Sequence, residues 1–297
     1  MAFLLRKAGG LAACAGKTTH RPHDDTDRCH LRCVKTGAHV DAAANPGVRV
    51  FPRFVADEET EAVVACARDL LERFGRSHAL NPRHLRVYNR QMAHLGDERP
   101  PINMLRVTGR YEMDDQPIAP WGHGDDLDID LVPAPLRRLV DRAQATPGLA
   151  LGKLRDVTIN YRHSSFFRLD AHVDPPKDGP NVCIIGLLSD TVLTISKVGP
   201  PASTSMDQRR VALESWDPDD VDALVRCNTM VHLHGPARDT LNHGIRLGLL
   251  ARELADRGAA LRDEPPGVLF DFFGTTDDPI RRRPERISVV FAFADPD

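Results

Sequence analysis

The sequence predicts a mainly β protein with flanking helices, built as an antiparallel sandwich or barrel. Its second half contains five short β-rich runs at close spacing. Turns rich in Pro, Gly and Asp separate these runs, which is typical of antiparallel strands and not of a parallel α/β sheet. The 297 residues are 41% hydrophobic and 27% charged, an ordinary globular composition that excludes a disordered or fibrous protein.

Residues 1–45 are rich in Gly, Ala, His and Thr without hydrophobic periodicity, so we expect a disordered tail or an organellar transit peptide there. The first 23 residues carry basic but no acidic side chains, as transit peptides do. Thiolates and imidazoles in this segment could also bind zinc. Their spacing fits no closed zinc site well, and an unstructured tail is the alternative. The side chains concerned are His20, His23, Cys29, His30 and Cys33.

An ordered domain is expected over 46–297, beginning with a strand and a helix. Alternating apolar residues predict the strand at 47–55. The helix follows at 56–75, where Asp57 can cap its beginning and Gly75 can end it. One face of this helix is apolar, which indicates that it covers a sheet.

The stretch 76–125 is interrupted by prolines and carries one strand candidate, 103–111. A second helix is predicted at 133–144, where Pro133 stands at the start and leucines form one face. A third helix is predicted at 246–262 from leucines at helical spacing. The β-rich runs that are expected to form the sheets are 155–162, 182–189, 191–198, 228–235 and 286–293.

The charge balance restricts the class of partner. There are 39 basic and 42 acidic residues, a formal charge of −3, and only 5% of the residues are aromatic. A general nucleic-acid coat is therefore disfavoured, because it needs a broad positive field and rings that stack on bases. No apolar run is long enough to span a bilayer, and six cysteines are too few for a disulfide scaffold. These features favour an intracellular, reducing compartment.

The most informative motif is His172-Val173-Asp174. On an extended chain, residues two apart project from the same face, so this imidazole and this carboxylate can converge on one ion. They would supply part of a 2-His-1-carboxylate triad, which binds Fe(II) and leaves positions open for a cosubstrate and dioxygen. The motif is common by chance, and a loop histidine that hydrogen-bonds a neighbouring Asp is the alternative reading.

A third ligand is expected from the segment 233–245, where a strand ends at Gly235 and His243 follows after a turn. This places an imidazole at the rim of a sheet, far along the chain from the first pair. His232 and His234 are rivals, but they alternate within the strand and are not held by the turn. We therefore expect His243 to be the ligand.

A basic run, 281–290, leads into the last strand. Arg281 to Arg283 are expected to form a solvated patch. Arg286 differs, because it opens an apolar strand and its guanidinium can point into a barrel. A buried Arg there needs a carboxylate partner, and a dicarboxylate ligand would satisfy it with two charge-assisted hydrogen bonds.

Taken together, these segments resemble the AlkB family of Fe(II)/2-oxoglutarate-dependent dioxygenases, and the order of elements matches too. The resemblance is firm over about 150–297. Within the family, "LLSDTVLTIS" looks most like the AlkB homologue subgroup numbered four, which implies lysine demethylation. The motifs that carry the resemblance are "NY" (160–161), "HVD" (172–174), "IGLLSDTVLTIS" (185–196), "LHGPARDTLNHGI" (233–245) and "RISVVF" (286–291).

The resemblance implies a double-stranded β-helix, or jelly roll, with helices packed outside. It implies three cofactors and cosubstrates: Fe(II), 2-oxoglutarate and dioxygen. Arg286 would pair with the distal carboxylate of 2-oxoglutarate. Asn160 and Tyr161 would help to hold this cosubstrate, and Ser288 would border the same pocket. The iron ligands carried over by the resemblance are His172, Asp174 and His243.

Three departures from the family pattern stand out. Asn160 and Tyr161 are adjacent, whereas the family usually places one residue between them, so at most one of the two can face inward. Ala292 replaces a second basic residue expected six positions after Arg286. The segment 246–280 is longer than a direct strand return needs, so we expect an insertion near the mouth of the site, either a lid or a partner surface.

The expected activity is oxidative N-demethylation or hydroxylation of a methylated protein or small molecule, by a monomer that does not bind membranes. Demethylation of alkylated DNA or RNA bases is an alternative, with Arg281 to Arg283 joined by Arg209 and Arg210 as a local phosphate track. A non-catalytic binding module is a second alternative, since Ala292 departs from the pattern. An organelle is expected if residues 1–23 are a transit peptide, and otherwise the cytoplasm or nucleus.

Overall fold

The computed structural model describes most of the chain from residue 30 onward. Several sequence predictions fall outside the described residues: the transit peptide, the zinc ligands His20, His23 and Cys29, and the basic residues Arg209 and Arg210. The described residues are 30–34, 36–77, 104–110, 119–163, 169–197, 219–246, 248–256, 261, 264 and 268–296.

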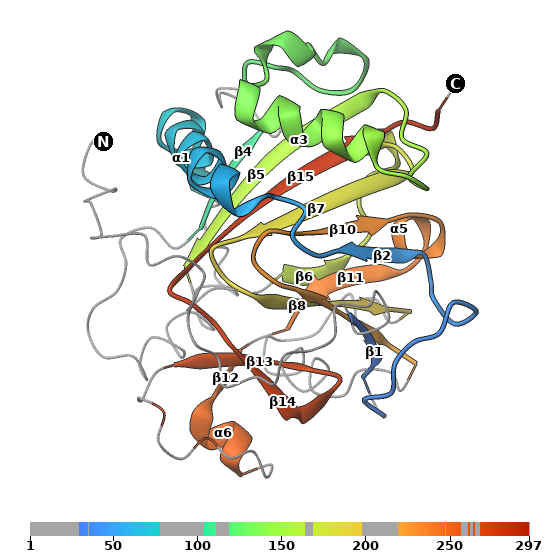
Figure 1. Cartoon of the computed structure of the whole chain (residues 1–297), viewed down its shortest axis with the longest axis vertical. Coiled ribbons are helices and arrows are strands. Elements are labelled where there is room, and N and C mark those ends of the chain that lie inside the picture. The colour runs from blue at the N-terminus through green and yellow to red at the C-terminus, as the bar shows by residue number, and fades with distance from the viewer. Residues whose placement is uncertain are drawn as a thin grey trace.

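Two antiparallel sheets pack face to face and form a double-stranded β-helix, which confirms the predicted fold class (Figure 1). The larger sheet has the order β2-β10-β7-β15-β5-β4-β3, and the smaller sheet has the order β1-β9-β8-β11-β6. The larger sheet consists of β2 (Val48–Phe51), β3 (Arg76–Ser77), β4 (Met104–Thr108), β5 (Leu154–His163), β7 (Asn181–Leu187), β10 (Thr229–Leu233) and β15 (Glu285–Phe293). The smaller sheet consists of β1 (Leu31–Cys33), β6 (Leu169–His172), β8 (Thr191–Ser196), β9 (Val221–Val225) and β11 (Asn242–Ile245).

The two faces of β15 separate the two main cores. Ile287, Val289 and Phe291 belong to the core under the helices. Val290 and Ala292, which alternate with them, face the smaller sheet and pack with side chains of β8, β9 and β11. Because side chains alternate along a strand, even-numbered positions of β15 line the space between the two sheets.

Two helices cover the outer face of the larger sheet, as predicted. They are α1 (Asp57–Phe74) and α3 (Ala134–Ala145), and Figure 1 shows both above β5 and β15. Pro133 precedes the first turn of α3 as expected. The predicted cap of α1 is wrong by one position: Ala56 is the N-cap, and the Glu59 carboxylate accepts a hydrogen bond from its N–H at 3.4 Å. Among the described residues, no helix is long and apolar enough to cross a membrane.

The predicted boundary of the N-terminal tail is wrong. Residues 31–33 form β1, which pairs with β9 in the register Leu31↔Ala223. Leu31 is buried in the core between the sheets, and its contacts join this segment to the domain. A three-residue strand has too little alternation to be recognised from sequence, and only its pairing with a distant strand reveals it.

The segment 246–280 also differs from its prediction. In place of a helix over 246–262, it holds β12 (Leu249–Leu250) and a short helix α6 (Ala251–Ala255). The end of the expected insertion is a hairpin of β13 (Leu269–Phe273) and β14 (Thr275–Arg281). Together with β12 it forms a third sheet, which lies beyond the smaller sheet in Figure 1.

This third sheet packs on the outer face of the smaller sheet. Phe273 and Ile280 form a core cluster with Val192 of β8 and Leu224 of β9. The segment therefore supports the smaller sheet from behind, whereas the sequence suggested a lid or partner surface at the mouth of the site.

Buried ion pairs and hydrogen bonds hold the third sheet against the smaller sheet. Asp271 accepts hydrogen bonds from Arg282 at 2.5 Å and from Thr191 of β8 at 2.9 Å. Asp222 of β9 pairs with Arg246 in the same way. Arg282 is only 4% exposed, so its assignment to a solvated patch is wrong.

Replacing Asp271 with Ala leaves the buried Arg282 without its carboxylate. The free energy of unfolding is therefore expected to fall by about 3 kcal/mol, the usual cost of breaking a buried pair from one side. Urea denaturation followed by circular dichroism measures it. The control is Asp130→Ala, which removes an exposed pair with Arg137 and should change the unfolding free energy by less than about 1 kcal/mol. Equal losses in the two variants would contradict the proposed role of the pair.

Candidate metal centre

The structure brings together the three predicted ligands. His172 is the last residue of β6, Asp174 follows two residues later, and His243 lies in β11. In the antiparallel β6–β11 pair, His172 and His243 stand directly opposite each other. One ligand atom from each residue lies within 4.8 Å of the others, and the group could hold a metal ion. Residues some seventy positions apart meet here because their strands are neighbours.

The carboxylate lies between the two imidazoles. His172 Nε2 is 3.5 Å from Asp174 Oδ1, and His243 Nε2 is 3.7 Å from Asp174 Oδ2. The ring centroids are 4.4 Å apart. The His243 side chain is only 4% exposed, whereas that of His172 is 40% exposed. The centre is therefore closed towards the core and open on one side, as a metal site that takes additional ligands requires.

The environment sets the protonation state that a metal needs. Burial lowers the pKa of His243 to about 4, against the opposing charge of Asp174. Burial by itself raises the pKa of Asp174, but the hydrogen bond from His172 and the charge of His243 bring it well below its usual range. At neutral pH, His243 is therefore neutral and Asp174 is ionised, and these are the forms that ligate metal.

The two rival histidines, His232 and His234, lie on the outer face of the larger sheet, away from the space between the two sheets. His232 alternates along β10 with Val231 and Leu233 of the inner core and shares a face with Met230, which packs under the helices. Its ring stacks on that of His234 at 5.0 Å, and its Nε2 lies 3.0 Å from Asn181 Oδ1. The structure does not bring either residue to the triad.

Arg286 faces the space between the sheets and is only 4% exposed. Within the described part of the chain, its Nε has no hydrogen-bond partner and no carboxylate forms an ion pair with it. Burial lowers its pKa to about 10, while the charge of Asp271 opposes this shift, so Arg286 remains protonated at neutral pH. Asp271 is itself bound to Arg282. A buried cation without an anion fits an arriving carboxylate ligand.

Ser288 and Asn160 lie on the same face as Arg286. They are cross-strand partners on β15 and β5, and Asn160 Oδ1 accepts a hydrogen bond from Arg106 Nε at 3.1 Å. Tyr161 points to the opposite face, where it packs against the core under the helices and donates to Glu285 at 3.1 Å. Because Asn160 and Tyr161 are adjacent on one strand, their side chains point to opposite faces of the sheet. The structure therefore does not bring Tyr161 to the face that carries Arg286.

A buried arginine that was not among the predicted site residues supports the centre. Arg238 lies in the four-residue helix α5 (Pro236–Asp239), which leads into the His243 strand, and it is 2% exposed. It donates to the backbone carbonyls of Asp174 at 3.1 Å and Pro175 at 2.8 Å. One side chain thus ties the element before His243 to the backbone at Asp174. The sequence signal for this role is the position of Arg238 inside the motif "GPARDTLNHGI", which also contains the ligand candidate His243.

Arg238→Met is expected to weaken metal binding by about 10–100-fold, the usual effect of removing a group that orients a ligand. Calorimetric titration with Ni(II) measures the change. Arg137→Met, which alters only an exposed pair, is the matched control. Unchanged Ni(II) affinity in a folded Arg238→Met variant would contradict this role.

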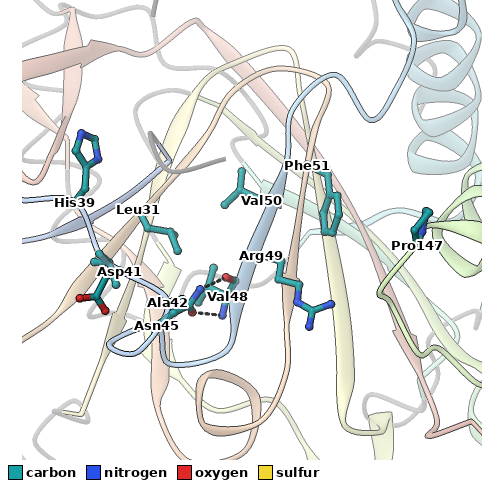
Figure 2. Close-up of a pocket in the computed structure, with 11 residues that line it drawn as sticks. Leu31, His39, Asp41, Ala42, Asn45, Val48, Arg49, Val50, Phe51 and Pro147 are labelled. Atoms are coloured by element: carbon teal, nitrogen blue, oxygen red, sulfur yellow. Dashed lines mark hydrogen bonds between the residues drawn. The ribbon is translucent and has the colours of Figure 1, made fainter. Parts of the chain in front are cut away.

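A separate pocket of about 550 Å³ opens beside the edge strands β1 and β2. Figure 2 shows Leu31 and Val50 on its wall, with Asn45 hydrogen-bonded to the backbone of Val48. Neither the triad nor Arg286 lines it. It is therefore distinct from the candidate metal centre.

No family model matches the chain, and no curated protein matches it either. Among solved structures, the chain is similar to that of OsALKBH1, with 13% identity, a TM-score of 0.41, and coverage of 84% of this chain and 98% of that one. It is similar to a prolyl hydroxylase from Trichoplax adhaerens, with 10% identity, a TM-score of 0.39, and coverage of 84% of each chain.

HygX from Streptomyces hygroscopicus, solved with nickel and 2-oxoglutarate, shows 15% identity and a TM-score of 0.41, and covers 84% of this chain and 83% of its own. Similarities at this level assign no activity. The residues of the site therefore have to support the proposed function.

Proposed function

We propose that this protein is an Fe(II)- and 2-oxoglutarate-dependent dioxygenase that performs oxidative N-demethylation or hydroxylation of a methylated protein or small molecule. The observation that carries the proposal is the convergence of His172, Asp174 and His243 at the end of a sandwich whose interior also holds Arg286, whose Nε has no hydrogen-bond partner among the described residues. Two imidazoles and one carboxylate are the donor set of non-haem Fe(II) oxygenases. Arg286 offers the two-pronged geometry that a carboxylate needs.

When bound, the iron and its cosubstrate would supply the oxidising chemistry that breaks a substrate C–H bond. The chain supplies position and environment. Asp174 and His243 would hold the metal from the buried wall, and His172 would hold it from the partly exposed side. Arg286 would bind the distal carboxylate of 2-oxoglutarate, and Ser288 and Asn160 would line the same pocket. Apolar side chains between the sheets exclude water from this interior.

The direct test is the formation of succinate from 2-oxoglutarate by the purified chain with Fe(II). Methylated peptides are assayed in parallel for formaldehyde release, with methyl-lysine peptides first because of the sequence resemblance. Succinate that requires both Fe(II) and a methylated substrate supports the proposal. Nickel and 2-oxoglutarate that bind without any turnover across the panel would instead support a binding module.

A specific observation favours alkylated nucleic acid as the second candidate substrate. Cross-strand pairing places Arg286, Arg162, Arg106 and Arg76 on neighbouring strands of the larger sheet, on the face that carries Arg286. Arg162 and Arg286 are buried, whereas Arg76 and Arg106 are partly exposed and could contact the phosphates of a nucleic acid. The test is binding of methylated oligonucleotides at increasing salt. Binding that falls steeply with salt, accompanied by formaldehyde release, would support this substrate, and no binding at low salt would exclude it.

A further inference from the structure

A second group of charged residues lies beside the triad. Arg110 Nη2 is 3.1 Å from Asp156 Oδ2 and 2.5 Å from Asp178 Oδ2. Both carboxylates are completely buried, and the Arg110 side chain is 16% exposed. His123 Nε2 lies 3.1 Å from the other oxygen of Asp178. Arg110 is thus a single guanidinium that bridges two buried acids from different parts of the chain.

The three residues come from three separate elements. Arg110 follows β4 at a bend where its backbone N–H donates to Thr108 Oγ1. Asp156 is in β5, and Asp178 ends the short helix η5 (Pro176–Asp178). Removing Arg110 would leave two buried carboxylates without this cation, which is strongly destabilising. The contact is therefore required for the arrangement of these elements.

Asp156 accepts a hydrogen bond from Thr158 of its own strand at 2.9 Å, but its cationic partner comes from another element. Asp156 stands opposite Ala292 in the β5–β15 pair, with both side chains on the inner face. A methyl group there neither donates a hydrogen bond nor carries charge. Arg110 reaches Asp156 from beyond the end of β4 and supplies the cation.

Arg110 is linked to the metal centre through Asp178. The segment 174–178 begins with the ligand Asp174 and ends with Asp178, and its two ends are held by different arginines. Arg238 binds the carbonyls of Asp174 and Pro175, and Arg110 binds the side chain of Asp178. With both ends held, the backbone that carries the Asp174 carboxylate has little freedom to rotate away from the two imidazoles.

We propose that Arg110 is a positioning residue of the metal centre, which holds the segment 174–178 so that Asp174 faces His172 and His243. It does not contact the metal. The inference rests on the proposed metal site but does not depend on the identity of the substrate. Arg110 therefore has a role in metal affinity that can be measured without turnover.

The test compares Ni(II) affinity, measured by calorimetry, in the full chain and its variants. Arg110→Ala is expected to weaken Ni(II) binding by about 10–100-fold. Arg110→Lys keeps the positive charge but cannot bridge both carboxylates as the guanidinium does, so it should recover only part of the lost affinity. The Co(II) absorption spectrum provides a second readout, because a displaced Asp174 alters the ligand field.

A structural control separates positioning from general destabilisation. Arg142→Ala removes an arginine that bridges Glu59 and the carbonyl of Phe54 near the helices. It should lower the melting temperature while leaving Ni(II) affinity unchanged. If Arg110→Ala does not fold, the charge-neutral variant Arg110→Gln, Asp156→Asn, Asp178→Asn is used, and it should show the same loss of affinity.

The outcomes distinguish this inference from the proposed function. Wild-type protein that binds no Ni(II) or Fe(II) would overturn both. Wild-type binding, with unchanged affinity in folded Arg110→Ala or in the charge-neutral variant, would overturn only the role of Arg110. Loss of affinity in these variants, together with partial recovery in Arg110→Lys, would establish it.

Discussion

Replacing His172 with Ala is expected to abolish succinate formation, with turnover falling by about a thousandfold or more, because a metal site with one ligand missing loses both affinity and geometry. The side chain is partly exposed and lies outside the two main cores, so the fold should survive. Its contribution is therefore expected in metal binding and not in stability. Calorimetric titration with Ni(II) and a coupled succinate assay measure the two effects separately.

The matched control is His39→Ala, which removes an exposed histidine that lines the separate pocket. It should leave both Ni(II) affinity and turnover unchanged. Iron-dependent turnover that persists in His172→Ala would exclude His172 as a ligand. The same loss in His39→Ala would point to a nonspecific effect of removing histidine.

Replacing Arg286 with Met is expected to have two opposite effects. Binding of 2-oxoglutarate should be lost, because the side chain that would pair with its distal carboxylate is gone. The unliganded protein should become more stable, by about 1 kcal/mol or more, because a buried cation without a bound partner is replaced by an apolar chain of similar length. Tryptophan fluorescence titration with 2-oxoglutarate and urea denaturation measure the two changes.

Arg286→Lys separates charge from geometry. A lysine keeps the positive charge but cannot form the two-pronged contact, so cosubstrate affinity should lie between wild type and Arg286→Met. Arg283→Met, next to the same strand, is the control and should bind 2-oxoglutarate like wild type. A loss of stability in Arg286→Met together with unchanged cosubstrate binding would assign Arg286 a structural role and exclude the proposed one.

Strand prediction succeeded where each strand has a long apolar pattern. The run 155–162 became β5 and the run 286–293 became β15, each within one residue at either end. Helix α3 was recognised because Pro133 marks its start and Leu136 and Leu139 recur on one face. These signals are local, and a local signal survives in any tertiary context that buries the same face.

Prediction failed where long-range contacts decide the structure. Leucines near 250 suggested a helix, but Leu249 and Leu250 pair with β13 instead. Arg282 looked like a surface residue because it stands in a basic run. In the structure its guanidinium instead pairs with Asp271 in the interior, and Thr191 donates a hydrogen bond to the same carboxylate. No property of a short segment shows which distant carboxylate it will meet.

The sequence by itself predicted the mainly β architecture, which the structure confirms, because alternation is encoded in neighbouring residues. The HVD and HGI motifs predicted one set of candidate ligands. The tertiary structure places His243, and not His232, opposite His172, since this contact depends on strand pairing. The tertiary structure also showed that Asn160 lies inside while Tyr161 lies outside. The two arginines that hold the segment of Asp174, Arg110 and Arg238, come from elements distant in sequence, so their role depends on contacts that form only in the folded chain.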